Sequence, residues 1–121
     1  EITDITKEES VATFIAGIVR SVRFGFASSH GKANMMCYNF MEENGAFTRN
    51  ADGKYVVDFE KAPSVIDAWS SLILETQATG NFELAQKYAA EHASISEGLA
   101  ADIEKVNGAG IPRDIVFEFN W

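Results

Sequence analysis

The segment from Ser28 to Phe47 contains the side chains of this sequence that are best suited to chemistry. It reads Ser-Ser-His-Gly-Lys-Ala-Asn-Met-Met-Cys-Tyr-Asn-Phe-Met-Glu-Glu-Asn-Gly-Ala-Phe. His30, Lys32 and Asn34 come first, the segment then becomes apolar, and Asn44-Gly45 is a helix stop before a hairpin. Polar groups at the start of an apolar helix can line a cleft while the rest of the helix is buried. An imidazole there can hydrogen-bond a substrate, and the alternative is a polar residue without a ligand.

The sequence offers no set of metal ligands at a workable spacing. Its two histidines, His30 and His92, lie far apart in the chain. His30 and Cys37 share a helical face, but a metal site needs at least a third ligand. Cys37 is therefore predicted to be a small buried hydrophobic residue. The segment 50–53 predicts a turn and not a calcium loop, because Phe59 stands where calcium needs a bidentate Glu. Phosphate-binding glycine loops, nucleophile elbows and the long Glu-rich box of the Nudix hydrolases are absent.

Composition narrows the class of protein. The chain has 121 residues, of which 46% are hydrophobic and 23% charged, values that are ordinary for a folded soluble domain. A net charge of −8 argues against nucleic acid or an anionic membrane as partner. Cys37 is the only cysteine, so an intrachain disulfide is impossible. No apolar run approaches the ~18 residues that a membrane span needs.

The pattern of apolar residues and caps predicts five helices. Thr6 and Glu9 form a capping box before an amphipathic stripe that runs to the Phe24–Phe26 region. A second helix is expected from about Ser29 to Glu43, either separate from the first or as its bent continuation. The remaining three are expected as follows: one with Pro63 in its first turn and ending at Gly80, one capped by Asn81, and one begun by a capping box at 94–97 and ended by Asn107-Gly108.

Two segments are predicted to be extended. Residues 46–59 alternate around Asp52-Gly53 and indicate a β-hairpin. Residues 114–119 alternate well enough for a terminal strand. The predicted fold is therefore mainly α, a helical bundle of about five helices with one β-hairpin and a short C-terminal strand, forming a single unit over residues 1–121.

The region from about residue 20 to 95 resembles the C-terminal part of a known enzyme family. The match runs from His30 through the hairpin into the next helix, and it is to the dipeptidyl peptidase III family, the zinc peptidases of the M49 type. The short bacterial members with a Ser-Ser-His-Gly-Lys-Ala-Asn stretch are the most similar. The resemblance implies a fragment of a metallopeptidase, a hydrolase, in which this non-catalytic C-terminal domain supplies a wall of the substrate cleft and a helical scaffold.

The same resemblance implies the site residues. His30, Lys32, Asn34 and Asn39 would bind substrate, and no catalytic or metal-binding residue is expected in this chain. The better-studied long members have arginines four and nine positions after the His, where this chain has Asn34 and Asn39, which leaves Lys32 as the cation. The family's His-Glu-x-x-x-His zinc helix is absent, so no cofactor is expected here and zinc is expected in the parent chain.

The expected partners follow from the same family. The chain begins at Glu1 without a Met, so we expect it to be part of a larger, cytoplasmic protein, with the upstream part of that protein and a peptide substrate as its partners. Self-association through exposed apolar faces is a further expectation, whereas nucleic acid and membrane are not expected as partners. The alternative hypothesis is a stand-alone helical protein-binding or regulatory domain without catalysis.

Overall fold

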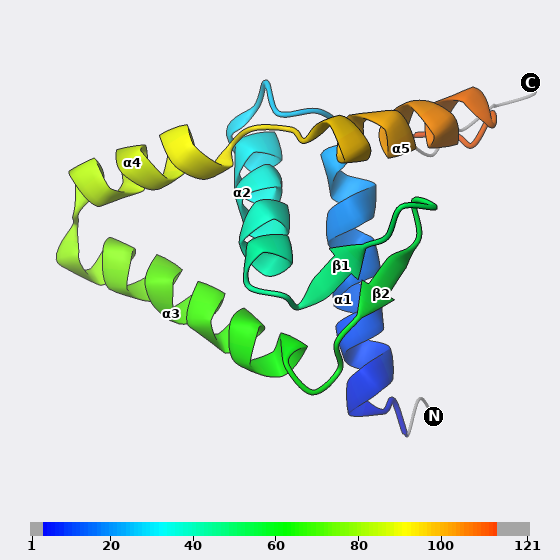
Figure 1. Cartoon of the computed structure of the whole chain (residues 1–121). Coiled ribbons are helices and arrows are strands. Elements are labelled where there is room, and N and C mark those ends of the chain that lie inside the picture. The colour runs from blue at the N-terminus through cyan, green and yellow to red at the C-terminus, as the bar shows by residue number, and fades with distance from the viewer. Residues whose placement is uncertain (1–3, 114–121) are drawn as a thin grey trace, which may run out of the picture.

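The computed structural model describes residues 4–113, which form five α-helices and one two-stranded antiparallel hairpin (Figure 1). The mainly α class with about five helices and a hairpin is thereby confirmed, while the strand predicted at 114–119 lies outside the described residues. No helix in the described part is long and apolar enough to cross a membrane. The elements are α1 Lys7–Val22, α2 Ser29–Glu43, β1 Phe47–Arg49, β2 Tyr55–Val57, α3 Ala62–Thr79, α4 Phe82–His92 and α5 Glu97–Gly108.

Side-chain caps set the beginnings of α1, α2, α4 and α5, whereas α3 begins without one and has Pro63 in its first turn. The Thr6 hydroxyl accepts a hydrogen bond from the Glu9 amide at 3.1 Å, and the Glu9 carboxylate accepts from the Thr6 amide at 2.8 Å. Ser28 caps α2 and Asn81 caps α4 through one hydrogen bond each, which their side chains accept from a backbone amide in the first turn. The capping box predicted at 94–97 is wrong, because Ser96 is the N-cap of α5 and accepts from the Leu99 amide.

The core lies between α1, α2 and the hairpin. One face of α1, with Ile15 and Ile18, is buried against α2, which lies beside it. Tyr38 of α2 and Phe47 of β1 are fully buried, and their ring centroids are 5.1 Å apart. Met35 of α2 is also buried in this core. Burial of such large side chains supplies most of the driving force for this arrangement.

Glycine is required in the first turn of α2. The loop that follows α1 folds back over this turn, and a Cβ at Gly31 would overlap the carbonyl oxygen of Gly25 and come within 2.8 Å of the Phe26 Cα. Helix α1 thus ends at Val22, earlier than predicted, and α2 is a separate helix. This close backbone approach explains why residue 31 is a glycine.

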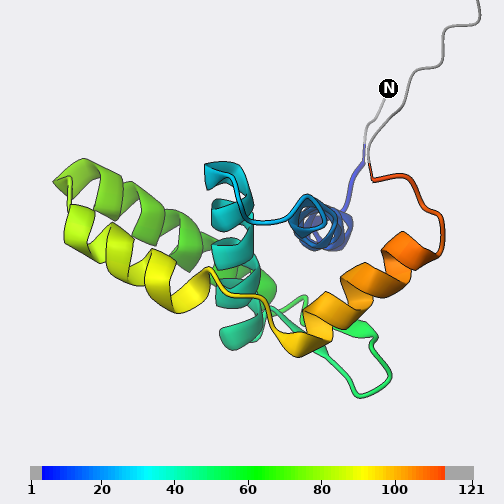
Figure 2. The same ribbon diagram turned by 90° about the horizontal axis from the view of Figure 1, so that it is seen from above.

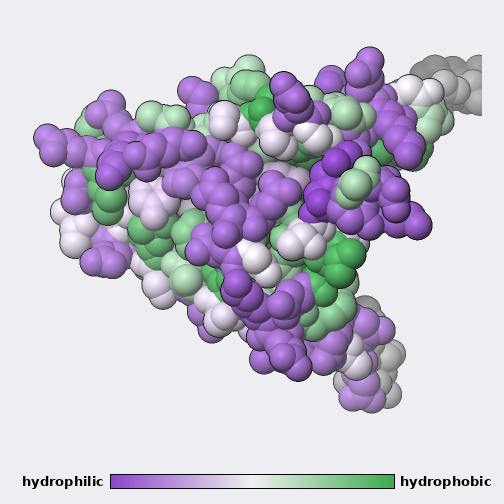
Figure 3. Space-filling view, viewed as in Figure 1, coloured by the Kyte–Doolittle hydropathy of each residue, from purple (hydrophilic) through white to green (hydrophobic). Residues whose placement is uncertain are grey.

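Helices α3 and α4 form an antiparallel arm that extends beyond α2 (Figures 1 and 2). In α3 only Ala62 and Val65 are buried, and α4 has no buried residue. The apolar residues of α3 that face α2 are only half-buried, and Trp69 packs against Phe40 of α2 with 5.2 Å between ring centroids. Hydrophilic side chains cover much of this face of the molecule, with apolar groups between them (Figure 3).

Candidate functional site

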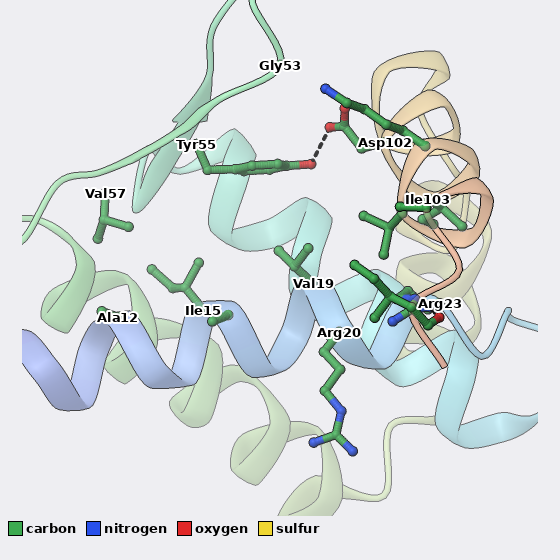
Figure 4. A pocket seen from close by; sticks show the side chains of 15 residues that line it. Ala12, Ile15, Val19, Arg20, Arg23, Gly53, Tyr55, Val57, Asp102 and Ile103 are labelled. Atoms are coloured by element: carbon green, nitrogen blue, oxygen red, sulfur yellow. Dashed lines mark hydrogen bonds between the residues drawn. The ribbon is translucent and has the colours of Figure 1, made fainter. Parts of the chain in front are cut away.

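A cavity of about 690 Å³ lies between α1, β2 and α5. Its walls are mainly apolar, and Figure 4 shows several of the side chains that form them. Helix α1 contributes Ile15 and Val19, β2 contributes Tyr55 and Val57, and α5 contributes Ile103. A volume of this size is in the range of pockets that hold small organic molecules, about 300–1,000 Å³.

The cavity exists because two helices present apolar faces to each other without packing together. On α1, Ala12, Ala16 and Val19 lie on a face next to the one that meets α2. On α5, Ile103 and Val106 are three positions apart and share a face. At one end of the space, Tyr55 of the hairpin points toward Asp102 of α5 (Figure 4).

A hydrogen-bonded cluster closes that end. The Tyr38 hydroxyl donates to the Tyr55 hydroxyl at 3.3 Å, and the Tyr55 hydroxyl donates to Oδ2 of Asp102 at 2.9 Å. Nε of Arg49 donates to Oδ2 of Asp102 at 2.6 Å, and Nη2 donates to Oδ1 at 2.9 Å. A two-pronged guanidinium–carboxylate pair of this kind fixes both position and orientation.

Two glycines leave space for the Arg49 side chain. A Cβ at Gly53 of the hairpin turn would lie 3.1 Å from Nη2 of Arg49, and one at Gly98 of α5 would lie 3.2 Å from Nη1. Gly53 also has a φ of +74°, which a side chain would strain. The guanidinium therefore passes between the hairpin and α5 at a place where both elements lack a side chain.

The environment of this cluster fixes its protonation at neutral pH. The hydrogen bond from Arg49, followed by that from Tyr55, holds the pKa of Asp102 below its ordinary value. The hydrogen bond to Asp102 raises the pKa of Arg49. Burial is the main cause that raises the pKa values of Tyr38 and Tyr55. Asp102 is thus a carboxylate, Arg49 is a cation and both tyrosines are neutral donors.

Arg23 marks another part of the cavity wall. It caps the C-terminus of α1, and its Nη2 donates to Oδ1 of Asn107 at 3.1 Å and to the carbonyl of Ile111 at 2.9 Å. Its Nε is buried and has no hydrogen-bond partner among the described residues. Arg20 is adjacent in the lining, but its side chain points away from the cavity (Figure 4).

None of the four residues predicted to bind substrate lines this cavity. His30 and Lys32 are exposed on the first turn of α2, and Asn34 is half-buried. Asn39 is buried, and its amide donates to the carbonyls of His92 at 2.6 Å and Ser94 at 2.8 Å, so it ties the end of α4 to α2. A role in substrate binding for these four residues stays a prediction.

The predictions on metal ligands can be compared with the geometry directly. Cys37 is buried, as expected, and burial raises the pKa of its thiol to about 11. Oδ1 of Asn50 accepts from the amides of Asp52 and Lys54, so segment 50–53 forms the predicted turn. Within residues 4–113 no group of three or more His, Cys, Asp or Glu side chains is placed to hold a metal ion.

The sequence did contain a signal for the cluster at Asp102. Leu99, Asp102, Ile103 and Val106 follow one another at the spacing of a single helical face. A carboxylate on an apolar face requires a cation or hydrogen-bond donors from elsewhere in the fold. Arg49 and Tyr55 of the hairpin supply them.

Comparison with known proteins gives a different relationship from the one that the sequence suggested. Nudix hydrolase 3 of Arabidopsis thaliana is 32% identical to this chain over 108 residues. The matched region covers 89% of this chain and 14% of the relative, so the chain spans about one seventh of the relative's length. No family model matches the chain, and no solved structure matches it.

This finding contradicts the identification with the M49 peptidases. The relative is named as a Nudix hydrolase and not as a dipeptidyl peptidase. The predicted role as the C-terminal portion of a zinc metallopeptidase is therefore wrong, and so are the partners inferred from it, the upstream peptidase and a peptide substrate. The alternative of a stand-alone helical binding or regulatory domain finds no support either. Zinc in a parent chain was expected only from this resemblance, and it stays untested.

Proposed function

We propose that this chain takes part in the hydrolysis of nucleotide derivatives and that its cavity between α1, β2 and α5 binds the apolar part of the substrate. The name of the 32% identical relative supports the class of reaction. The single observation that carries the binding role is the cavity of about 690 Å³, whose mainly apolar walls meet a fixed polar cluster at one end. Apolar walls with a few well-placed polar groups are what small-molecule sites share.

A nucleobase fits the chemistry of this cavity. Its planar ring would lie between the aliphatic side chains of Val19 and Ile103, with Tyr55 at its edge. Oδ2 of Asp102 accepts two hydrogen bonds and Oδ1 accepts one, so the carboxylate keeps acceptor capacity for an amino group of the base. Because Arg49 holds this carboxylate in place, the remaining lone pair of Oδ1 has a fixed direction.

Binding of nucleoside diphosphates by calorimetry tests this proposal. We expect at least one of the adenosine, guanosine, cytidine and uridine diphosphates to bind. Val19→Phe and Ile103→Phe would fill the cavity and weaken binding by about tenfold or more, equivalent to about 1.4 kcal/mol. Val56→Phe is the matched control, because Val56 is exposed on the hairpin, and it should leave the affinity unchanged.

Two results would overturn the proposal. One is the absence of binding by all four nucleotides. The other is an equal loss of affinity in the Val56→Phe control, or none in the two cavity-filling variants. Melting temperatures of all three variants show whether each has kept its fold.

A further inference from the structure

The two oxygens of the Asp102 carboxylate are not equally occupied. Oδ2 accepts hydrogen bonds from Nε of Arg49 at 2.6 Å and from the Tyr55 hydroxyl at 2.9 Å. Oδ1 accepts only one among the described residues, from Nη2 of Arg49 at 2.9 Å. Because each carboxylate oxygen has two lone pairs, Oδ2 is saturated and Oδ1 can accept one further hydrogen bond.

The Asp102 side chain remains accessible to a ligand. It lines the cavity, and 18% of its side-chain surface is exposed. Gly53 of the hairpin turn also lines the cavity, and a Cβ at this position would lie 3.3 Å from Oδ1 of Asp102. Because residue 53 is a glycine, the turn adds no side-chain atom beside this oxygen (Figure 4).

Asp102 is the only carboxylate among the described residues that line the cavity. The other charged residues of the lining are the cations Arg20, Arg23 and Lys105, whose side chains offer no hydrogen-bond acceptor. Lys105 follows Asp102 by three positions on α5, but it is exposed and forms no ion pair with Asp102, so it does not use the free lone pair of Oδ1. A ligand that donates a hydrogen bond to a charged group of this cavity must therefore donate it to Asp102.

We infer that Asp102 selects nucleotides whose base has an exocyclic amino group, as adenine, cytosine and guanine do, over those whose base lacks one, as hypoxanthine and uracil do. The inference rests on the proposed function and names the class of nucleotide that the cavity takes. An amino group can donate to Oδ1, and hydrogen bonds to a charged acceptor are stronger than neutral ones. A carbonyl oxygen in its place would face the carboxylate with no proton between the two acceptors, and the ring N–H of hypoxanthine and uracil lies beside such an oxygen.

Matched nucleoside diphosphates test this inference on the wild-type chain by calorimetry. Inosine diphosphate has an oxygen where adenosine diphosphate has its amino group, and it lacks the amino group of guanosine diphosphate. Uridine diphosphate differs in the same way from cytidine diphosphate. We expect at least one of the three amino-bearing nucleotides to bind about tenfold or more tightly than its partner. Because the phosphates are the same throughout, such a difference comes from the base.

A substitution then assigns the preference to the carboxylate. Asp102→Asn keeps the size of the side chain but replaces one acceptor oxygen by an NH₂ donor. Arg49 and Tyr55 donate three hydrogen bonds to residue 102, so the amide oxygen should face them and leave the NH₂ group for the ligand. The preference for amino-bearing bases should fall by about tenfold or reverse. Asp67→Asn is the matched control, because Asp67 is exposed on α3, does not line the cavity and carries the same charge, and it should keep the wild-type preference.

The outcomes separate this inference from the proposed function. Equal or tighter binding of inosine and uridine diphosphates by the wild-type chain overturns the selection by Asp102, and this measurement does not depend on any variant that fails to fold. A preference that persists in Asp102→Asn, shown to be folded by circular dichroism, overturns it too, as does an equal loss in Asp67→Asn. If nucleotides bind in these cases and Val19→Phe and Ile103→Phe weaken them, the proposed function stands. If no nucleoside diphosphate binds, both are overturned.

Discussion

The carboxylate of Asp102 connects α5 to the hairpin. It accepts hydrogen bonds from Arg49 and Tyr55, and the Tyr38 hydroxyl extends the chain of bonds into the core. Such a cluster is worth more than its separate bonds only while every member is satisfied. Removing one hydroxyl from the cluster should therefore lower the stability of the fold by more than the one lost hydrogen bond is worth.

Tyr55→Phe should destabilise the fold by about 1–2 kcal/mol, because one bond is lost and the buried Tyr38 hydroxyl is left without its acceptor. Chemical denaturation of the variant and the wild type measures this change. Tyr88→Phe is the control, since no hydrogen bond involves that half-buried hydroxyl within the described residues. A loss as large in Tyr88→Phe as in Tyr55→Phe would contradict the role of the cluster.

The lowered pKa of Asp102 predicts how stability changes with pH. The folded state favours the carboxylate, so this group adds stability at neutral pH. That stability should decline as the pH falls through the ordinary value of 3.8 and then through the lower pKa of the folded state. The difference in unfolding free energy between wild type and Asp102→Asn should therefore be constant near neutral pH and shrink in acid. A difference that stays the same at pH 3 would contradict the assignment.

At the scale of elements, local caps and glycines set most boundaries. The predicted span of α2, the Asn81 cap of α4 and the turn at 50–53 are confirmed because each depends on neighbouring residues. The predicted start of α5 at Ser94 is wrong because the carbonyl of Ser94 accepts a hydrogen bond from Asn39 of α2, which fixes that backbone as a loop. A contact between residues 55 positions apart cannot be deduced from local sequence.

The candidate site was missed for the same reason. Arg49 and Asp102 are 53 positions apart, and only the packing of α5 beside the hairpin turn brings them together. The polar residues at the start of α2 were conspicuous in sequence, but the chain uses Gly31 there for close packing against a loop. Asn39, which was predicted to bind substrate, donates hydrogen bonds to the carbonyls of His92 and Ser94 and so links α2 to the end of α4, while its predicted role stays untested.

A pair of glycine substitutions tests the packing of α2. Gly31→Ala should destabilise the fold by about 1–3 kcal/mol, because its Cβ would overlap backbone atoms of Gly25 and Phe26, which cannot move away by rotating as a side chain could. A Cβ at Gly17 in α1 would have no atom within 4 Å, so Gly17→Ala should stabilise the fold by about 0.5–1 kcal/mol through the higher helix propensity of alanine. Thermal and chemical unfolding of the two variants measures the contrast. Equal stabilisation by both alanines would contradict the close approach of the loop to α2.

At the scale of the whole molecule, the described residues form three parts: a core, an arm, and the side on which the cavity lies between α1, β2 and α5. Helices α1 and α2 with the hairpin enclose the buried residues, and α3 with α4 extends away from them (Figure 2). Helix α5 buries only Leu99, and it faces α1 across the cavity. The cavity combines apolar walls with the polar cluster at Asp102, and small-molecule sites share this combination.

The most direct test of this account is a titration of the chain with a nucleoside diphosphate, followed through the methyl signals of isoleucine, leucine and valine by NMR. We predict saturable shifts of Ile15, Val19 and Ile103, which line the cavity, while Leu74 on the exposed surface of α3 does not move. Saturable shifts at Leu74 with no change at the three cavity residues, or no shifts at all, would contradict the claim that this cavity is the binding site.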